Sequence, residues 1–449
     1  MTTRADWIER QLDEARLRPV HVRALALCTI IMMIDGYDLY LVGWILPKLS
    51  DAFAVTRLQL TPVLLLQQIG MLLGGYFVAP LADRIGRRRL LLICLGGIGL
   101  TSFATAFATT PGQFTWGRIA TGLFAAAIVP NLLALSSEVA PKRLRATFAT
   151  ITICGAMGGS LIGAFMQAFI LIPYGWRGAV LLGAALPVAI LPIVMLLLPE
   201  SLRYLSRKNP QDKRIPVILS AYGITGEPIE FPVGTPSFEE APAAGTVKAL
   251  FAGNSRGFTI LLWAIFICSF AFIGQWGAWS TTVFHDVLHM NWPAVARVTT
   301  IYTLLGVVGT LGVGLAIDRF GFRAVLPAAF FLGFLGAIGI GMTAGDSVMY
   351  LALGVMSLFQ VASQAGLAAL APTLYTSQLR ATGVGAAYGA GRIGSMAGPA
   401  LGSALLASGS GVVPIFAGFG VPLLVAAILL LFLLPRPTRA GLGGALQPA

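Results

Sequence analysis

Two carboxylates interrupt a long apolar stretch near the start of the chain. Asp35 and Asp38 lie in MMIDGYDLYLVGWIL, three residues apart, so a helix places them on one face. A charged carboxylate at the centre of a bilayer costs at least about 2.5 kcal/mol, and such residues therefore mark functional sites. Two neighbouring carboxylates disfavour joint ionisation, so one tends to keep a proton. The pair predicts a site that takes up and releases protons.

Two arginines also lie within apolar stretches. Arg118 lies in GRIATG, on a segment expected to run antiparallel to that of Asp38, so the two side chains reach a similar depth. Arg392 lies in GAGRIGSMAGP, where glycines leave room for a ligand, and its planar guanidinium can hold a carboxylate through two hydrogen bonds. Two structural alternatives stay open: Arg118 ties helices together through the acidic pair, or Arg392 pairs with Asp35.

Aromatic and amide side chains accompany these charges. The segment FAFIGQWGAWSTTVF carries Gln275, Trp276 and Trp279, which offer hydrogen bonds and flat apolar surface to a ligand. For any one aromatic residue, packing against lipid is the commoner role. Further side chains predicted to contact the substrate are Tyr40, Trp44, Phe124, Gln360, Gln364 and Tyr388.

The elements that hold these residues are predicted to be membrane helices. The chain of 449 residues is 57% hydrophobic and only 11% charged, whereas a soluble protein carries about 25% charged residues. Stretches long enough to cross a hydrocarbon core of about 30 Å recur along the chain. They cover residues 23–46, 59–82, 89–109, 113–136, 147–170, 177–198, 258–284, 294–317, 324–343, 348–371, 382–406 and 412–434. We therefore predict an all-α membrane protein of twelve transmembrane helices.

The distribution of basic residues predicts the orientation of these helices. With the N-terminus inside, the loops that face outward hold few basic residues, and the inward loops hold nearly all the others. This asymmetry predicts that both termini are cytoplasmic and that the protein is a multi-pass protein of the inner (plasma) membrane. It also accounts for the net charge of +12 without a nucleic-acid partner. The outward basic residues are Lys48, Arg57, Arg177 and Arg297.

Two sequence elements occur twice at the same spacing. LADRIGRR at 81–88 resembles AIDRFGFR at 316–323, and LRAT at 144–147 recurs at 379–382, in both cases 235 residues later (318 − 83 and 380 − 145). This indicates a duplicated six-helix unit. We predict an N-terminal bundle over 1–198 with a charged lead-in, a proline-rich cytoplasmic linker over 199–257, and a C-terminal bundle with a short tail over 258–449.

The repeated loops are predicted to gate the cytoplasmic side. Their acidic residues can face helix N-termini while their arginines pair across bundles, and breaking such contacts would open the inner gate. The alternative is a role in orientation and loop shape alone. The predicted gating residues are Asp83, Arg84, Arg87 and Arg145 in the first half, and Asp318, Arg319 and Arg380 in the second.

The D-R-x-G-x-R loops resemble those of the major facilitator superfamily, although Ala79 stands where the opening glycine is usual. Within it, four segments resemble the aromatic acid:proton symporter family: MIDGYDLYLVG at 33–43, GRIATGLFAAAIVPNLLALSSEVAP at 117–141, PESLRYL at 199–205 and LRATGVGAAYGAGRIGSMAGPALG at 379–402. The resemblance implies that Asp35, Asp38, Arg118, Glu138, Arg380 and Arg392 matter for transport. We assign Glu138 to proton coupling with Asp35, Asp38 and Arg118, and Asn131 to the substrate-contacting set.

These features together predict a secondary active transporter that imports an aromatic carboxylate by proton symport through alternating access. We expect no enzyme activity, no metal and no cofactor, with the proton as coupling ion; the expected partners are a small aromatic acid and the lipid bilayer, and the expected state is a monomer. The alternatives are a proton-coupled exporter of drugs or metabolites, a carrier of sugars or other organic anions, and a non-transporting membrane sensor. The absence of a G-P signature from GAMGGSLIGAFMQ disfavours the exporter.

Overall fold

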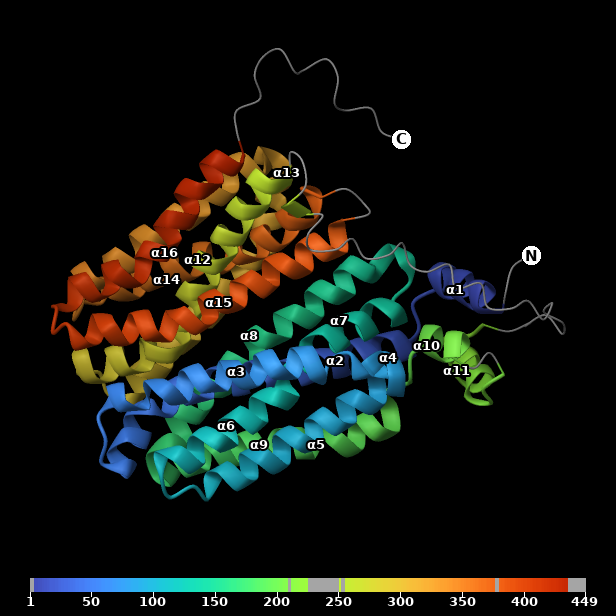
Figure 1. Ribbon diagram of the computed structural model, residues 1–449, viewed down its shortest axis with the longest axis horizontal. Coiled ribbons are helices and arrows are strands. Elements are labelled where there is room, and N and C mark those ends of the chain that lie inside the picture. The colour runs from blue at the N-terminus through green and yellow to red at the C-terminus, as the bar shows by residue number, and fades with distance from the viewer. Residues whose placement is uncertain (1–3, 209–210, 225–249, 252–254, 376–378, 435–449) are drawn as a thin grey trace, which may run out of the picture. The chain divides into compact units, whose positions relative to one another are not determined.

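The computed structural model describes the whole chain except residues 1–3, 209–210, 225–249, 252–254, 376–378 and 435–449 (Figure 1). The described residues form helices joined by short loops and contain no strand. The α-helices are α1 (Arg4–Glu14), α2 (Pro19–Phe53), α3 (Thr61–Phe77), α4 (Leu81–Ile85), α5 (Arg87–Ala106), α6 (Pro111–Ala125), α7 (Ile128–Val139), α8 (Arg145–Phe169), α9 (Leu171–Leu197), α10 (Leu202–Lys208), α11 (Arg214–Tyr222), α12 (Ser255–Thr282), α13 (Trp292–Met342), α14 (Val348–Leu370), α15 (Arg380–Ala407) and α16 (Val412–Leu433). The predicted all-α class is confirmed.

Among the described residues, ten helical segments are long and apolar enough to cross a membrane. One of them combines α6 and α7 as Pro111–Val139, and another is the 51-residue α13. Within α13, Gly321 adopts φ 76°, a left-handed conformation that glycine reaches without a Cβ clash. This break divides α13 into two lengths at the point where the sequence predicts a loop. The count of twelve helices stays a prediction.

The described chain divides into two compact units, which are considered separately. The first contains Met1–Glu240 and Gly277–Thr303. In it, α2 packs against α8 and α9, α5 packs against α6 and α9, and α3 packs against α6 (Figure 1). A Cβ at Gly36 would lie 2.3 Å from the backbone oxygen of Ala156, so the missing side chain permits the close approach of α2 and α8.

Three short helices complete the first unit. The predicted N-terminal lead-in forms α1, whose Ile8 and Leu12 are buried in one hydrophobic cluster with Leu202, Ile215 and Leu219. The stretch predicted as a linker therefore includes two helices, α10 and α11, that pack in this cluster (Figure 1). Residues 225–249 of the predicted linker lie outside the described residues.

The second unit contains Ala241–Trp276 and Leu304–Ala449. Its helices approach closely where glycines face a neighbouring backbone: a Cβ at Gly309 of α13 would lie 2.0 Å from the Leu358 oxygen of α14, and one at Gly394 of α15 would lie 2.0 Å from the Ile267 oxygen of α12. The division between the units falls within α12 and α13. The domain boundaries at 198 and 258 stay a prediction about the duplicated sequence.

Candidate functional site

A buried ion pair joins α2 and α6 in the first unit. Arg118 Nη1 and Nη2 donate to Asp38 Oδ1 and Oδ2 at 2.9 and 2.8 Å, and Nη2 also donates to the Asp38 backbone oxygen at 3.2 Å. The Arg118 side chain is 0% exposed and that of Asp38 is 4% exposed. A bidentate guanidinium–carboxylate contact is among the stronger polar contacts in proteins, and here it joins two helices that the sequence predicts to cross the membrane.

The helix that carries Arg118 also lies close to α3. A Cβ at Gly122 of α6 would lie 2.7 Å from the Gln67 backbone oxygen of α3, so α6 and α3 lie close together. This approach lets Gln67 Oε1 accept a hydrogen bond from Arg118 Nε at 3.4 Å. Gln67 is 4% exposed and is a site residue that the sequence reasoning missed. Gln67 is a neutral residue in an apolar helix, so it does not stand out in the sequence as a buried charge does.

Asp35, the other carboxylate of the predicted pair, lies on the same helix as Asp38. Asp35 is 8% exposed on α2. Between the two acids, Tyr37 is fully buried and its hydroxyl donates to the Ala179 backbone oxygen of α9 at 2.8 Å. Tyr37 therefore fixes the rotation of α2 against α9, which sets the direction of both carboxylates. The predicted role of the acids in proton coupling stays a prediction.

An aromatic group follows the carboxylates along α2. The Trp44 ring lies 5.9 Å from that of Tyr40 and 5.7 Å from that of Tyr37, centroid to centroid. A Cβ at Gly163 of α8 would lie 2.1 Å from Trp44, so this ring occupies the space that the glycine leaves. Trp279, in the same unit, is fully buried.

Two residues of the first unit that were predicted to contact the substrate pack against, or hydrogen-bond to, neighbouring parts of the same unit. Phe124 packs over Gly97 of α5, where an added Cβ would lie 2.6 Å from its ring, and it borders the hydrophobic core. Asn131 donates from Nδ2 to the Ala127 backbone oxygen at 2.7 Å, one turn back on the helix. Both contacts lie within the first unit's own packing.

The second unit holds the other predicted substrate residues. The Tyr388 ring on α15 lies 5.1 Å from that of Phe266 and 5.9 Å from that of Phe270, both on α12. Ser269 donates to Gln364 Oε1 of α14. Arg392 is half-buried on α15.

Two glutamines of this unit are almost fully buried. Gln275 and Gln360 are each 1% exposed. Among the described residues, neither Oε1 nor Nε2 of Gln275 has a hydrogen-bond partner. Trp276, beside it on α12, stacks on Phe272 at 6.0 Å with an interplanar angle of 11°.

Glu138 lies in a cluster at the predicted cytoplasmic end. It forms an ion pair with Arg87 at 2.7 Å and accepts a hydrogen bond from the Ser201 hydroxyl. Glu200 Oε1 accepts from the Arg88 backbone N–H at 3.0 Å. The structure thus groups Glu138 with the predicted gating loop, and the PESLRYL segment supplies contacts that the sequence reasoning did not assign. The signal was available, since that segment was singled out as a motif.

The same segment also holds the backbone of the D-R-x-G-x-R loop. The Tyr204 hydroxyl donates to the Arg84 backbone oxygen at 3.0 Å, and the Lys208 amine donates to the same oxygen. Gly86 takes φ 102° in this loop, a conformation that disfavours any residue with a Cβ. Gly86 thus allows the loop conformation that α10 holds through these two hydrogen bonds.

The other predicted gating residues are spread over several surroundings. Arg145 pairs with Asp13 of α1. In the second unit, Asp318 is exposed and the Arg319 guanidinium lies over the Phe320 ring at 5.3 Å, beside the break at Gly321. The side chains of Asp83 and Arg380 lie outside the described residues.

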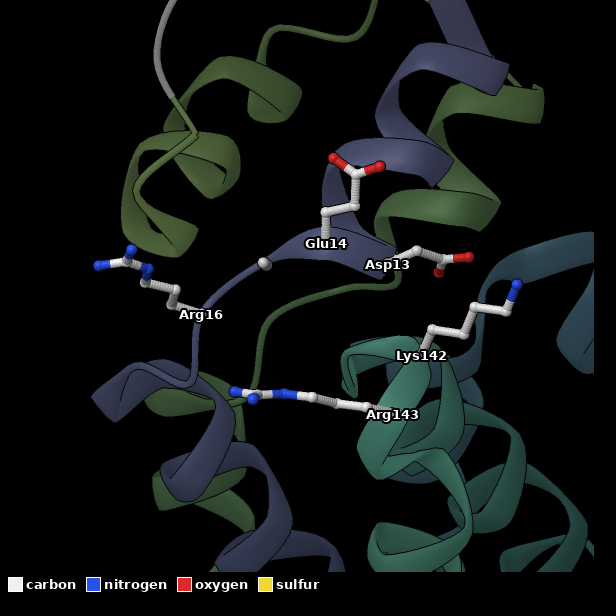
Figure 2. Close-up of a pocket in the computed structure, with 6 residues that line it drawn as sticks. Asp13, Glu14, Arg16, Lys142 and Arg143 are labelled. Carbon is white, nitrogen blue, oxygen red and sulfur yellow. The ribbon is translucent and has the colours of Figure 1, made fainter.

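A cavity of about 490 Å³ opens between α1 and the loop before α8 (Figure 2). Charged side chains of both signs surround it, and no predicted substrate residue does. This composition suits a solvated surface more than an aromatic ligand. Its lining residues are Asp13, Glu14, Ala15, Arg16, Lys142 and Arg143.

A second ion cluster joins distant parts of the first unit. Arg57 donates from Nε to Asp286 Oδ2 at 2.7 Å and from Nη1 to Asp51 at 2.9 Å. His285 Nδ1 lies 2.8 Å from the other oxygen of Asp286. The Arg57 and Asp286 side chains remain 31% and 25% exposed. The pair spans 229 positions of the sequence, so no local pattern could have indicated it.

Comparison with known proteins places the chain in a family. The family model described as Major Facilitator Superfamily matches residues 28–345 and 293–447. The chain is 31% identical over 429 residues to the gallate transporter of Pseudomonas putida, covering 95% of this chain and 94% of the relative. It is 30% identical to the 4-hydroxybenzoate transporter of Pseudomonas aeruginosa, covering 94% and 95%. It is 29% identical to the 3-(3-hydroxy-phenyl)propionate transporter of Escherichia coli, covering 92% and 94%.

Solved structures with a similar fold include other transporters. A bacterial homolog of the human lysosomal transporter Spinster, in an inward-facing and unoccupied conformation, superposes with a TM-score of 0.69 at 14% identity, covering 93% of this chain and 96% of that one. A D-xylose-proton symporter superposes with a TM-score of 0.69 at 17% identity, covering 92% and 98%. At these identities the likeness is one of fold alone.

Proposed function

Because the chain belongs to the major facilitator superfamily, we propose that it is a secondary active transporter that imports an aromatic carboxylate together with protons. The relatives named for gallate, 4-hydroxybenzoate and 3-(3-hydroxy-phenyl)propionate transport match it over more than nine tenths of both chains. None of these names refers to drug export or sugar transport, so the alternative functions lack comparable support.

The observation that carries this proposal is the buried Asp38–Arg118 pair. Its atoms lie 2.8 and 2.9 Å apart inside apolar helices, where charge is costly and the charges that are retained mark functional sites. Protonation of Asp38 removes one charge of the pair and weakens its hold on Arg118. Asp35 lies one helical turn away and offers a second carboxylate for the same proton. A proton taken up here can thus change how α2 and α6 are held together.

We assign the substrate carboxylate to Arg392. Its side chain offers a planar fork of donors that matches a carboxylate, and Gly391 and Gly394 beside it add no side chain of their own. We keep Glu138 in the proton-coupling set; its ion pair with Arg87 joins it to the gating loop, and breaking that pair would release the loop. We further propose a monomer of the inner membrane with both termini cytoplasmic.

The test is equilibrium binding of an aromatic acid and of its uncharged amide to purified wild-type and Arg392→Ala protein. The proposal expects the acid to lose affinity by about tenfold or more, since charged hydrogen bonds contribute about 1.5–3 kcal/mol, while the amide changes little. Arg392→Lys should remain impaired, because an ammonium cannot reproduce the planar fork. Equal weakening of both ligands would show that Arg392 does not read the carboxylate.

A further inference from the structure

Gln275 has a buried amide without a hydrogen-bond partner in the part of the chain that the structure describes. Its side chain is 1% exposed, and among the described residues neither its oxygen nor its nitrogen has a hydrogen-bond partner. Buried polar groups in native proteins are nearly always paired, and each exception calls for an explanation. An amide combines one acceptor with two donors, so a single neutral group that both donates and accepts can satisfy it.

The contact between α12 and α15 is made largely by glycines, which carry no polar side chain. Gly394 and Gly398 of α15 lie against the α12 backbone: a Cβ at Gly398 would lie 2.3 Å from the Ala271 backbone oxygen and 2.7 Å from the Gln275 backbone nitrogen. Glycines bring the two backbones together and offer no side chain to the amide. On α12 itself, Phe272 and Trp276 are stacked beside Gln275 and provide aromatic surface without an acceptor.

The register of the two helices relates Gln275 to Arg392. Gly394 faces Ile267 and Gly398 faces Ala271, so both helices advance by four residues together and run parallel. Arg392 therefore lies near the level of Ile267, and Gln275 lies about eight residues further along, or about 12 Å at 1.5 Å per residue. That separation is several times a hydrogen-bond length. A small planar acid can meet both groups only with its opposite ends.

We propose that Gln275 is a specificity-determining residue that binds a neutral polar substituent, a hydroxyl above all, at the end of the aromatic ring away from the carboxylate. This inference rests on the proposed function, in which Arg392 holds the carboxylate. A phenolic hydroxyl both donates and accepts, so it satisfies the amide. An unsubstituted or methylated ring leaves the amide unpaired, and sites built to hydrogen-bond a hydroxyl reject analogues that lack it.

The experiment measures dissociation constants for benzoate, 4-methylbenzoate and 2-, 3- and 4-hydroxybenzoate with purified full-length protein in lipid nanodiscs. For the wild type, 3- or 4-hydroxybenzoate should bind at least about tenfold more tightly than benzoate. The 4-methyl and 2-hydroxy compounds should show no such gain, since a methyl group cannot form a hydrogen bond and a 2-hydroxyl lies beside the carboxylate.

Two variants locate the effect. Gln275→Leu should remove the preference for the hydroxylated ring while benzoate affinity changes by less than about twofold. Gln275→Asn keeps the amide but withdraws it by one methylene, and should reduce the preference by several-fold. Gln68→Leu on α3, which removes another membrane amide with an unpaired Oε1, is the matched control and should keep the wild-type preference.

Several results would overturn the proposal. A wild type that binds benzoate and all three hydroxybenzoates equally well contradicts it and leaves the proposed function standing. If Gln275→Leu weakens the binding of all ligands equally, the amide contacts the carboxylate that they share and not the hydroxyl. An unchanged preference in Gln275→Asn and Gln275→Leu removes Gln275 from the site. A wild type that binds no aromatic acid overturns the proposed function, and this inference with it.

Discussion

Removing one partner of the Asp38–Arg118 pair should cost more stability than removing both. The two side chains are 0% and 4% exposed, and their bonds of 2.8 and 2.9 Å satisfy each other. Losing one partner of such a pair leaves a buried charge and costs about 3–5 kcal/mol, whereas apolar replacement of both is often neutral or stabilising. We therefore expect the double variant Asp38→Leu with Arg118→Met to be more stable than either single variant.

The two single variants should also differ from each other. In Arg118→Met, the remaining Asp38 can take up a proton and become neutral, so its cost should lie near about 3 kcal/mol and shrink as the pH falls. In Asp38→Leu, the guanidinium cannot lose its proton, and it keeps only hydrogen bonds to neutral groups: the Gln67 amide at 3.4 Å and the backbone oxygen of residue 38 at 3.2 Å. That cost should lie near about 5 kcal/mol and be independent of pH.

The assay is reversible denaturant unfolding in detergent micelles, followed by the circular dichroism of the helices. The Arg57–Asp286 pair is the matched control, because its side chains are 31% and 25% exposed. A partly exposed pair should show a coupling of only about 0.2–1 kcal/mol in the same double-mutant cycle. If the Asp38–Arg118 coupling is no larger than that of this control, the reasoning from burial is wrong.

Three further predictions concern the gating cluster, a close contact between helices and the orientation of the chain. Exchanging the charges of Arg87 and Glu138 should restore part of the transport that either single reversal removes, measured as uptake in cells, because the two groups pair at 2.7 Å. Gly36→Ala should reduce the yield of folded protein in size-exclusion chromatography, since its Cβ would lie 2.3 Å from a backbone oxygen of α8, whereas Gly75→Ala meets nothing within 4 Å and should not. A reporter fused after Arg214 should read cytoplasmic; a periplasmic readout would contradict the orientation inferred from basic residues.

The sequence was informative where the length of a helix and the depth of its charges determine the structure. Apolar length and the breaks at turns predicted the helices, because burial in a bilayer demands continuous helix. The meeting of Asp38 with Arg118 could be anticipated because antiparallel helices bring charges to a similar depth, and an unpaired charge there is costly.

Contacts that depend on loops and on register could not be read in this way. Glu138 was assigned to proton coupling from its motif, while its partner Arg87 belongs to a loop whose position depends on α10 and the segment before it. The bond between Arg57 and Asp286 joins segments whose pairing depends on tertiary packing alone. The amide of Gln275, which has no hydrogen-bond partner among the described residues, lies beside the α12–α15 contact, and no local pattern specifies the register of that contact.

The proposed transporter uses protons to drive the import of an aromatic acid, and uptake by reconstituted protein tests this coupling. Purified protein in liposomes is given radiolabelled 4-hydroxybenzoate with the outside acidic, and liposomes without protein correct for passive entry of the weak acid. We expect accumulation beyond the protein-free control that collapses with a protonophore and is lost in Asp35→Asn and Asp38→Asn. Accumulation that survives the protonophore, or a proton gradient that expels the label, would contradict the account.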